Sequence, residues 1–103
     1  MLGLVLKLTR IANNMTTKSV ADKSGISSTF ICDIENSRKK VSLENLKAIV
    51  KVYDIPLSKI LFFEEKAIEH NLNYQQILKM ILEYYVYEKN NENSNEQVLS
   101  KTK

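Results

Sequence analysis

The chain has 103 residues, of which 44% are hydrophobic and 26% are charged, and its formal net charge is +3. This length predicts one domain with a short appendage. No apolar run is long enough for a membrane span, and the apolar start lacks the basic region and the cleavage site of a signal peptide. The single cysteine excludes an intramolecular disulfide and favours a reducing environment, so we expect a cytoplasmic protein with no membrane partner.

The charge is distributed unevenly along the chain. Residues 1–63 carry ten Lys or Arg and five Asp or Glu, a net charge of +5, whereas residues 64–103 carry five and seven, a net charge of −2. A basic N-terminal part favours contacts with the phosphates of nucleic acid. Lysines that merely decorate solvated faces would give the same count, so the charge alone leaves both interpretations open.

The first predicted helix, over residues 2–13, is apolar on more than one side. The positions that would normally face water carry apolar residues, namely Leu4, Val5, Leu8, Ile11 and Ala12. A helix that is apolar all round is buried all round. We therefore expect another element to cover its outer face.

Residues 17–36 contain a small residue followed four positions later by a glycine. Ala21 allows two helices to cross closely, and Gly25 can take the left-handed conformation of a short turn without a Cβ penalty. The pattern predicts helices over residues 17–24 and 28–36, with Thr16 or Thr17 as the first N-cap and Ser27 as the second. The residues expected to point inward are Val20, Ile31 and Ile34. The residues expected to point outward on the second helix, as on a DNA-reading helix, are Ser28, Thr29, Cys32 and Asp33.

Three further helices are predicted after this pair. Ser42 should cap a helix that ends before Pro56 and whose core stripe is Leu43, Leu46, Ile49, Val50 and Tyr53. The next helix should open near Ser58, extend to about His70, and turn Ile60, Leu61 and Phe63 inward. The last should run from Tyr74 to about Lys89. Residues 90–103 are polar and are predicted to be a disordered tail.

The last predicted helix carries an apolar stripe wide enough to cover the first helix. The stripe consists of Ile77, Leu78, Ile81, Leu82 and Tyr85, and it is widened by Met80, Tyr84, Val86 and Tyr87. Burying such side chains is worth roughly 1.5–3 kcal/mol each before entropy is counted. The cover could come from the same chain or from a second subunit, and the excess of apolar surface favours a homodimer.

The order of characteristic residues extends well beyond the turn. The segments that match in order and without gaps are Leu2-Gly3, Arg10, Thr16–Ala21, Gly25, Ile31, Ile34-Glu35-Asn36, Arg38 and Ser42-Leu43. In this pattern the chain resembles the phage-repressor-like, or Xre-like, helix-turn-helix regulators over about residues 2–62. The resemblance implies an all-α, five-helix DNA-binding domain at residues 1–63. This domain is followed by a C-terminal helical extension at residues 64–89, which we expect to mediate dimerisation, and by the tail at residues 90–103.

The resemblance also implies roles for individual residues. The positions that read base edges hold Ser28, Thr29 and Asp33. The positions expected to contact phosphates hold Thr17, Ser27, Asn36, Arg38, Lys39 and Lys40. Arg10 and Glu35 match an ion pair that ties the first helix to the third.

Some of these assignments leave alternatives open. Asp33 suits a surface ion pair with Arg38 or a lysine equally well, and Thr17 suits a simple N-cap. The family usually has a glycine where this chain has Ser37, so the left-handed turn after the third helix is expected at Asn36 or Ser37.

The sequence contains no nucleophile–base pair, no metal-ligand cluster and no Gly-rich phosphate loop, so we expect no enzymatic activity, no metal and no cofactor. The leading hypothesis is a sequence-specific regulator of transcription, a repressor, that binds an inverted-repeat operator in double-stranded DNA as a homodimer through its third helix. The alternative is a protein-interaction module, such as an antitoxin or anti-regulator, that binds a protein partner through the apolar face of the C-terminal helix.

Overall fold

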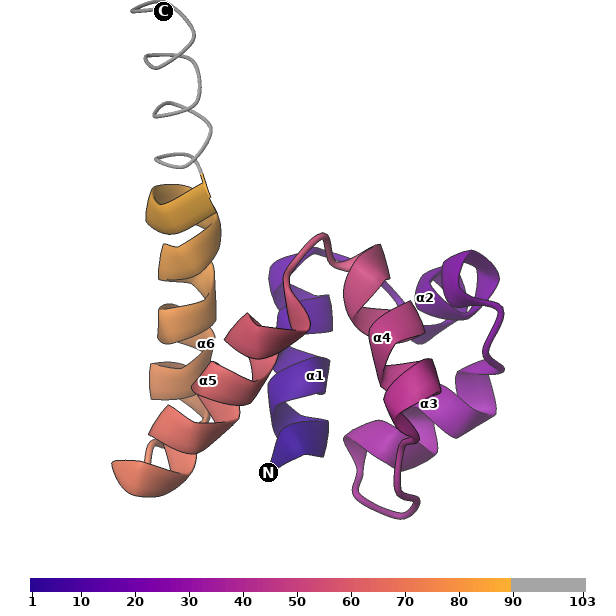
Figure 1. The fold of residues 1–103 in the computed structure, drawn as a ribbon, viewed down its shortest axis with the longest axis horizontal. Coiled ribbons are helices and arrows are strands. Elements are labelled where there is room, and N and C mark those ends of the chain that lie inside the picture. The colour runs from indigo at the N-terminus through magenta and orange to yellow at the C-terminus, as the bar shows by residue number, and fades with distance from the viewer. Residues whose placement is uncertain (90–103) are drawn as a thin grey trace, which may run out of the picture.

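The computed structural model describes residues 1–89, and this part of the chain is all-α (Figure 1). The helices are α1 (Leu2–Ala12), α2 (Thr17–Ser24), α3 (Ser28–Glu35), α4 (Leu43–Val52), α5 (Leu57–Glu69) and α6 (Tyr74–Glu83). A π-helical segment, η1 (Tyr84–Glu88), continues directly from α6. The predicted fold class is thereby confirmed, while the predicted disordered tail lies outside the described residues.

Helix α1 is the centre of the fold, and it contacts α3, α5 and α6 (Figure 1). Val5 and Leu8, two of the apolar residues on its outer side, are fully buried, which agrees with the expected cover. Ile11 is an exception, since 38% of its surface is exposed near the C-terminal end of the helix.

Helix α6 supplies the cover from within the same chain. Its side chains Ile77 and Ile81 are fully buried, and Tyr84 follows them into the core. The Tyr85 hydroxyl donates a hydrogen bond to the Tyr53 carbonyl oxygen at 2.7 Å and accepts one from Asn13 Nδ2 at 3.0 Å, which joins η1 to the ends of α1 and α4. The apolar stripe predicted from the sequence therefore covers two sides of the helix, and only one of these sides packs into the core.

Two side chains predicted to lie in the core, Leu43 and Leu61, are exposed instead, and Ile68 on α5 is exposed as well. Leu43 is the first residue of α4 and lies at the end of that helix. The buried face of α5 is formed by Ile60, Phe63 and Ala67. Leu61 and Ile68 each follow a buried residue by one position, which turns them about 100° away from the core.

Gly3 allows α1 to approach the C-terminal end of α3. A Cβ atom at this position would lie 2.4 Å from the Ile34 carbonyl oxygen and 2.8 Å from that of Glu35. Both distances are shorter than a real contact, and both neighbours are main-chain atoms that cannot rotate away. The position therefore requires glycine for close packing rather than for a special backbone angle.

Candidate nucleic-acid interface

The helices α2 and α3 form the predicted helix-turn-helix. Gly25 ends α2 in the left-handed conformation, with φ 77° and ψ 10°, and its N–H donates to the Ala21 carbonyl oxygen at 2.9 Å. Val20, Ile31 and Ile34 are buried as predicted. The turn therefore fixes the angle at which α3 leaves α2 and directs the remaining face of α3 outward.

Hydroxyl groups cap both helices of the motif. Thr16 Oγ1 accepts a hydrogen bond from the Ser19 N–H, and Ser27 Oγ accepts one from the Phe30 N–H, each at 3.1 Å. The N-cap of α2 is therefore Thr16, and Thr17 is the first residue within the helix. Since each capping oxygen is used as an acceptor, the Ser27 O–H can still donate to an anion.

The first turn of α3 presents small polar side chains. Thr29 is exposed and Ser28 is half-buried, and both follow the cap at Ser27. A hydroxyl can donate or accept a hydrogen bond, and the Thr29 methyl group can contact the methyl group of a thymine. These side chains can therefore meet base edges, but each specifies a base weakly.

The loop after α3 reverses the chain at Ser37. This residue adopts a left-handed φ of 59°, and its N–H donates to the Ile34 carbonyl oxygen at 3.0 Å. Asn36 is exposed, and its Nδ2 donates to the Cys32 carbonyl oxygen at 2.9 Å. Of the two positions expected for the left-handed turn, the structure thus selects the one where the resembling proteins usually have glycine.

Asp33 organises this loop. Its carboxylate oxygens lie 3.6 Å from Arg38 Nη1 and 3.8 Å from Lys39 Nζ, and its main-chain carbonyl accepts a hydrogen bond of 2.8 Å from the Arg38 N–H. Only 18% of the Asp33 side chain is exposed, whereas 68% of the Arg38 side chain is. The carboxylate is therefore engaged with cations, as in the surface ion pair that the sequence left open.

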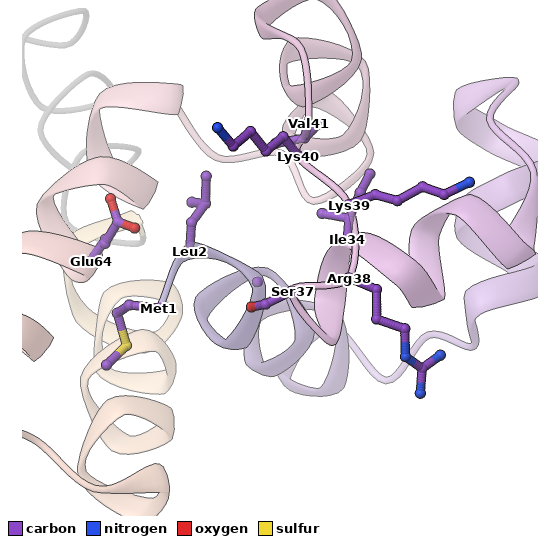
Figure 2. Close-up of a pocket in the computed structure, with 10 residues that line it drawn as sticks. Met1, Leu2, Ile34, Ser37, Arg38, Lys39, Lys40, Val41 and Glu64 are labelled. Atoms are coloured by element: carbon purple, nitrogen blue, oxygen red, sulfur yellow. The ribbon is translucent and has the colours of Figure 1, made fainter.

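The three cations of the loop point in different directions. Figure 2 shows Arg38 and Lys39 extending from one side of the loop, whereas Lys40 extends over a hollow of about 550 Å³ beside Leu2 and Glu64. The structure thus brings Arg38 and Lys39 together at the end of α3 and sets Lys40 apart from them. Arg38 and Lys39 therefore share Asp33 as a partner, whereas the Lys40 side chain extends away from them.

Arg10 and Glu35 form the ion pair expected between α1 and α3. Arg10 Nε and Nη2 donate to the two Glu35 carboxylate oxygens at 2.8 and 3.0 Å, and Nη1 donates to the Met15 carbonyl oxygen at 2.9 Å. Only 4% of the Glu35 side chain is exposed. The hydrogen bond from Arg10 to Glu35 raises the pKa of Arg10 further above its ordinary value. This bidentate pair holds α3 in place from behind and does not face a partner.

Within residues 1–89 no group of three or more His, Cys, Asp or Glu side chains could hold a metal ion. The same stretch contains no helix that is both long enough and apolar enough to cross a membrane.

Two contributions to the site were not predicted from the sequence, namely the close approach at Gly3 and the hydrogen bond from Arg10 to the Met15 carbonyl oxygen. The first had a signal in the matching Leu2-Gly3 pair, whereas a bond to a main-chain oxygen leaves none.

Comparison with known proteins identifies the family. Residues 6–60, more than half of the chain, match the family described as helix-turn-helix (HTH_3), and the match includes every residue predicted to contact DNA. Neither a curated protein nor a solved structure matches the chain. The family is a DNA-binding one and not a family of enzymes. The chain therefore belongs to the helix-turn-helix family of the Xre/Cro type.

Proposed function

We propose that the protein is a transcriptional repressor that binds an inverted-repeat operator as a homodimer, with α3 of each copy in the major groove. The observation that carries this proposal is the outer face of α3, where exposed Thr29 stands in the first turn and exposed Arg38 and Lys39 follow the last. Base-reading side chains flanked by phosphate-binding ones are what a recognition helix needs.

The proposed contacts divide into two kinds. Base edges would be read by Ser28 and Thr29, with Asp33 able to join them only if it leaves its cations. The proposed phosphate contacts come from the N-terminal ends of α2 and α3 and from the loop after α3: Thr17, Ser27, Asn36, Arg38, Lys39 and Lys40. Since hydroxyl groups are weak specifiers of bases, this interface should also depend on DNA shape.

Selection from a random duplex library, followed by binding measurements over a range of salt concentrations, tests the proposal. We expect one enriched inverted repeat and a slope of log affinity against log salt of about −3 to −8 for a dimer. A promoter that carries the selected site should be transcribed less in the presence of the protein. Absence of binding to every duplex at low salt would refute the proposal, and increased transcription would make the protein an activator.

Matched variants separate the two kinds of contact. Arg38→Ala with Lys39→Ala should weaken binding to all duplexes alike, because phosphate contacts carry no base information. Thr29→Ala should instead change the preferred bases within the half-site. Lys40→Ala is the internal control for the loop, and its effect should be smaller because this side chain points away from the other two cations. The reverse pattern would contradict the proposed docking.

Asp33→Asn tests whether the carboxylate organises the loop or reads a base. The substitution removes the charge that engages Arg38 and Lys39. If Asp33 only organises the loop, affinity for all duplexes should rise and base preference should stay the same. A change of preference at one base pair would assign a reading role to Asp33.

The spacing of half-sites tests the homodimer. Two recognition helices on the same face of a duplex should be about 34 Å apart, so the half-site centres should be about 10 base pairs apart or about twice that. Five additional base pairs rotate one half-site to the opposite face and should remove most of the cooperative affinity. Equal binding to both spacings would mean that the subunits bind independently.

One observation favours the alternative function, a protein-interaction module. Helix α6 and η1 expose Leu82, Val86 and Tyr87 although the helix already covers α1. An antitoxin or anti-regulator would use such a face for its partner. A chain that stays monomeric and binds no selected duplex would favour this alternative.

A further inference from the structure

The face of α6 and η1 that points away from α1 is apolar along its length. Leu82, Val86 and Tyr87 are 40%, 54% and 62% exposed, and Leu78 is half-buried at the edge. These four residues line a shallow hollow of about 350 Å³ together with Gln75, Lys79 and Glu83. We refer to Leu78, Leu82, Val86 and Tyr87 as the α6 outer face.

Opposite charges stand one turn apart on one flank of this face. Lys79 Nζ lies 4.0 Å from Glu83 Oε1 within the same helix, and both side chains are more than half exposed. A two-fold axis perpendicular to the helix would set this flank against the same flank of a second copy, with the chain direction reversed. Lys79 of each copy would then lie beside Glu83 of the other. A parallel pair would instead bring different flanks together and lose this match.

The position of α6 in the fold agrees with such a pairing. Figure 1 shows α6 on one side of α1 and the motif of α2 and α3 on the other, and α1 contacts both α3 and α6. Two copies joined through α6 would therefore keep both recognition helices exposed. The inward residues Ile77 and Ile81 stay in the core of each copy, so the monomer fold does not depend on the pairing.

We infer that the α6 outer face is the seam of an antiparallel homodimer whose two-fold axis passes close to Leu82. The second copy comes from the proposed function, and the inference adds which face it occupies and in which direction. The inference gives the residues of the predicted apolar stripe two different roles. Ile77, Ile81 and Tyr85 hold α6 to its own chain, while Leu78 and Leu82 meet the second copy.

Cross-linking tests the axis directly. In a chain with Cys32→Ser, the substitution Leu82→Cys places a thiol near the axis, where two Cα atoms can come within the roughly 4.4–6.8 Å that a disulfide needs. Mild oxidation should convert most of the protein to a covalent dimer. The matched control is Leu61→Cys on α5, since Leu61 and Leu82 are 43% and 40% exposed. Cross-linking of the control alone would place the seam on α5 and overturn the inference.

Charge reversal tests the direction of the pairing. Lys79→Glu or Glu83→Lys alone should weaken self-association about two- to tenfold, because each exposed pair is worth little but occurs twice across the axis. The double variant should restore it, and circular dichroism should be unchanged because both residues are exposed. Sedimentation equilibrium measures the association. Single variants that associate like the wild type would overturn the antiparallel arrangement.

Two further outcomes separate this inference from the proposed function. A protein that stays monomeric at high concentration but binds a half-site would overturn the seam and leave DNA binding intact. A protein that cross-links through Leu82→Cys but binds no selected duplex would do the opposite. Loss of the dimer on removal of residues 90–103 would assign the contact to that segment and overturn the inference as well.

Discussion

The helix-turn-helix and α6 are specified by different kinds of information. In the motif and the loop that follows it, the decisive features are main-chain conformations, with Gly25 and Ser37 in left-handed geometry. Gly3 of α1 adds a steric requirement, because a Cβ there would meet the carbonyl oxygens at the end of α3. In α6 no such position occurs, and the helix is held by the burial of Ile77 and Ile81. A left-handed turn is a local requirement, and a suitable residue at one position satisfies it. An apolar helix face shows that the helix will be buried, but it does not show which element will cover it.

Removal of α6 is the strongest test of this contrast. A chain that ends at Leu72 loses the buried side chains Ile77, Ile81 and Tyr84, at roughly 1.5–3 kcal/mol each. The total is comparable to the whole stability of a small domain, about 5–15 kcal/mol. We expect this chain to lose cooperative unfolding and to bind a hydrophobic dye, as measured by thermal circular dichroism and fluorescence.

The control for this truncation is a chain that ends at Lys89. It retains α6, η1 and the ion pair between Lys89 and Asp54. We expect its midpoint of thermal unfolding to stay close to that of the full chain. If the shorter chain unfolded as cooperatively as this control, the motif would be stable by itself and α6 would only add to it.

The ion pair between Arg10 and Glu35 should have the next largest effect. Removing one partner of a buried pair leaves an uncompensated charge, which costs about 3–5 kcal/mol. Glu35→Leu should therefore destabilise the protein strongly, as measured by urea denaturation. Arg10→Met combined with Glu35→Leu should cost less than Glu35→Leu alone, because no buried charge remains. An additive result would show that the two residues act independently.

The sequence predicted the motif closely and α6 only in part. The caps at Ser27 and Ser42, the turn at Gly25 and the inward residues Val20 and Ile31 follow from short-range requirements, and the structure agrees with each. Leu43 and Leu61 were misjudged because apolar residues in a helical pattern do not reveal where the core ends. The division of the α6 stripe into inward and outward residues depends on how α6 packs against α1. A local sequence pattern carries no information on that packing.

The engagement of Asp33 shows the same limit within the motif. The sequence placed Asp33 outward on α3 and left two roles open. The choice between them depends on the loop conformation, since the left-handed turn at Ser37 brings Arg38 and Lys39 back toward the carboxylate. A residue at a position that matches the family pattern therefore indicates a role. Whether its side chain is free to perform that role depends on the charged residues that surround it in the fold.

A comparison of the two glycines distinguishes packing from backbone conformation. Gly3→Ala inserts a Cβ against main-chain oxygens and should cost about 1–3 kcal/mol, as overpacking does. Gly25→Ala meets nothing within 4 Å and suffers only from its φ of 77°, which costs about 1–2 kcal/mol. Urea denaturation should show both losses, and only Gly3→Ala should disturb the packing of α1 on α3, which can be followed by amide hydrogen exchange. Equal exchange patterns would contradict this distinction.

The smallest effect is expected at the Tyr85 hydroxyl, which joins η1 to the ends of α1 and α4. Tyr85→Phe removes the hydrogen bonds to Tyr53 and from Asn13, and we expect a loss of about 1 kcal/mol at neutral pH. Burial raises the pKa of Tyr85 from 10.0 to about 12, so the folded protein keeps this proton while the unfolded chain loses it. The stabilisation is complete below pH 10 and falls as the pH rises toward 12.

Phenylalanine has no proton to lose, so the variant lacks this part of the pH dependence. Burial also raises the pKa of Tyr53, which lowers the stability of both proteins at alkaline pH. The free energies of unfolding of wild type and variant should therefore converge above pH 10, although both decline. Urea denaturation at several alkaline pH values measures the difference. Two parallel curves would mean that the Tyr85 hydroxyl ionises equally in both states, and that η1 is held to α1 and α4 by packing alone.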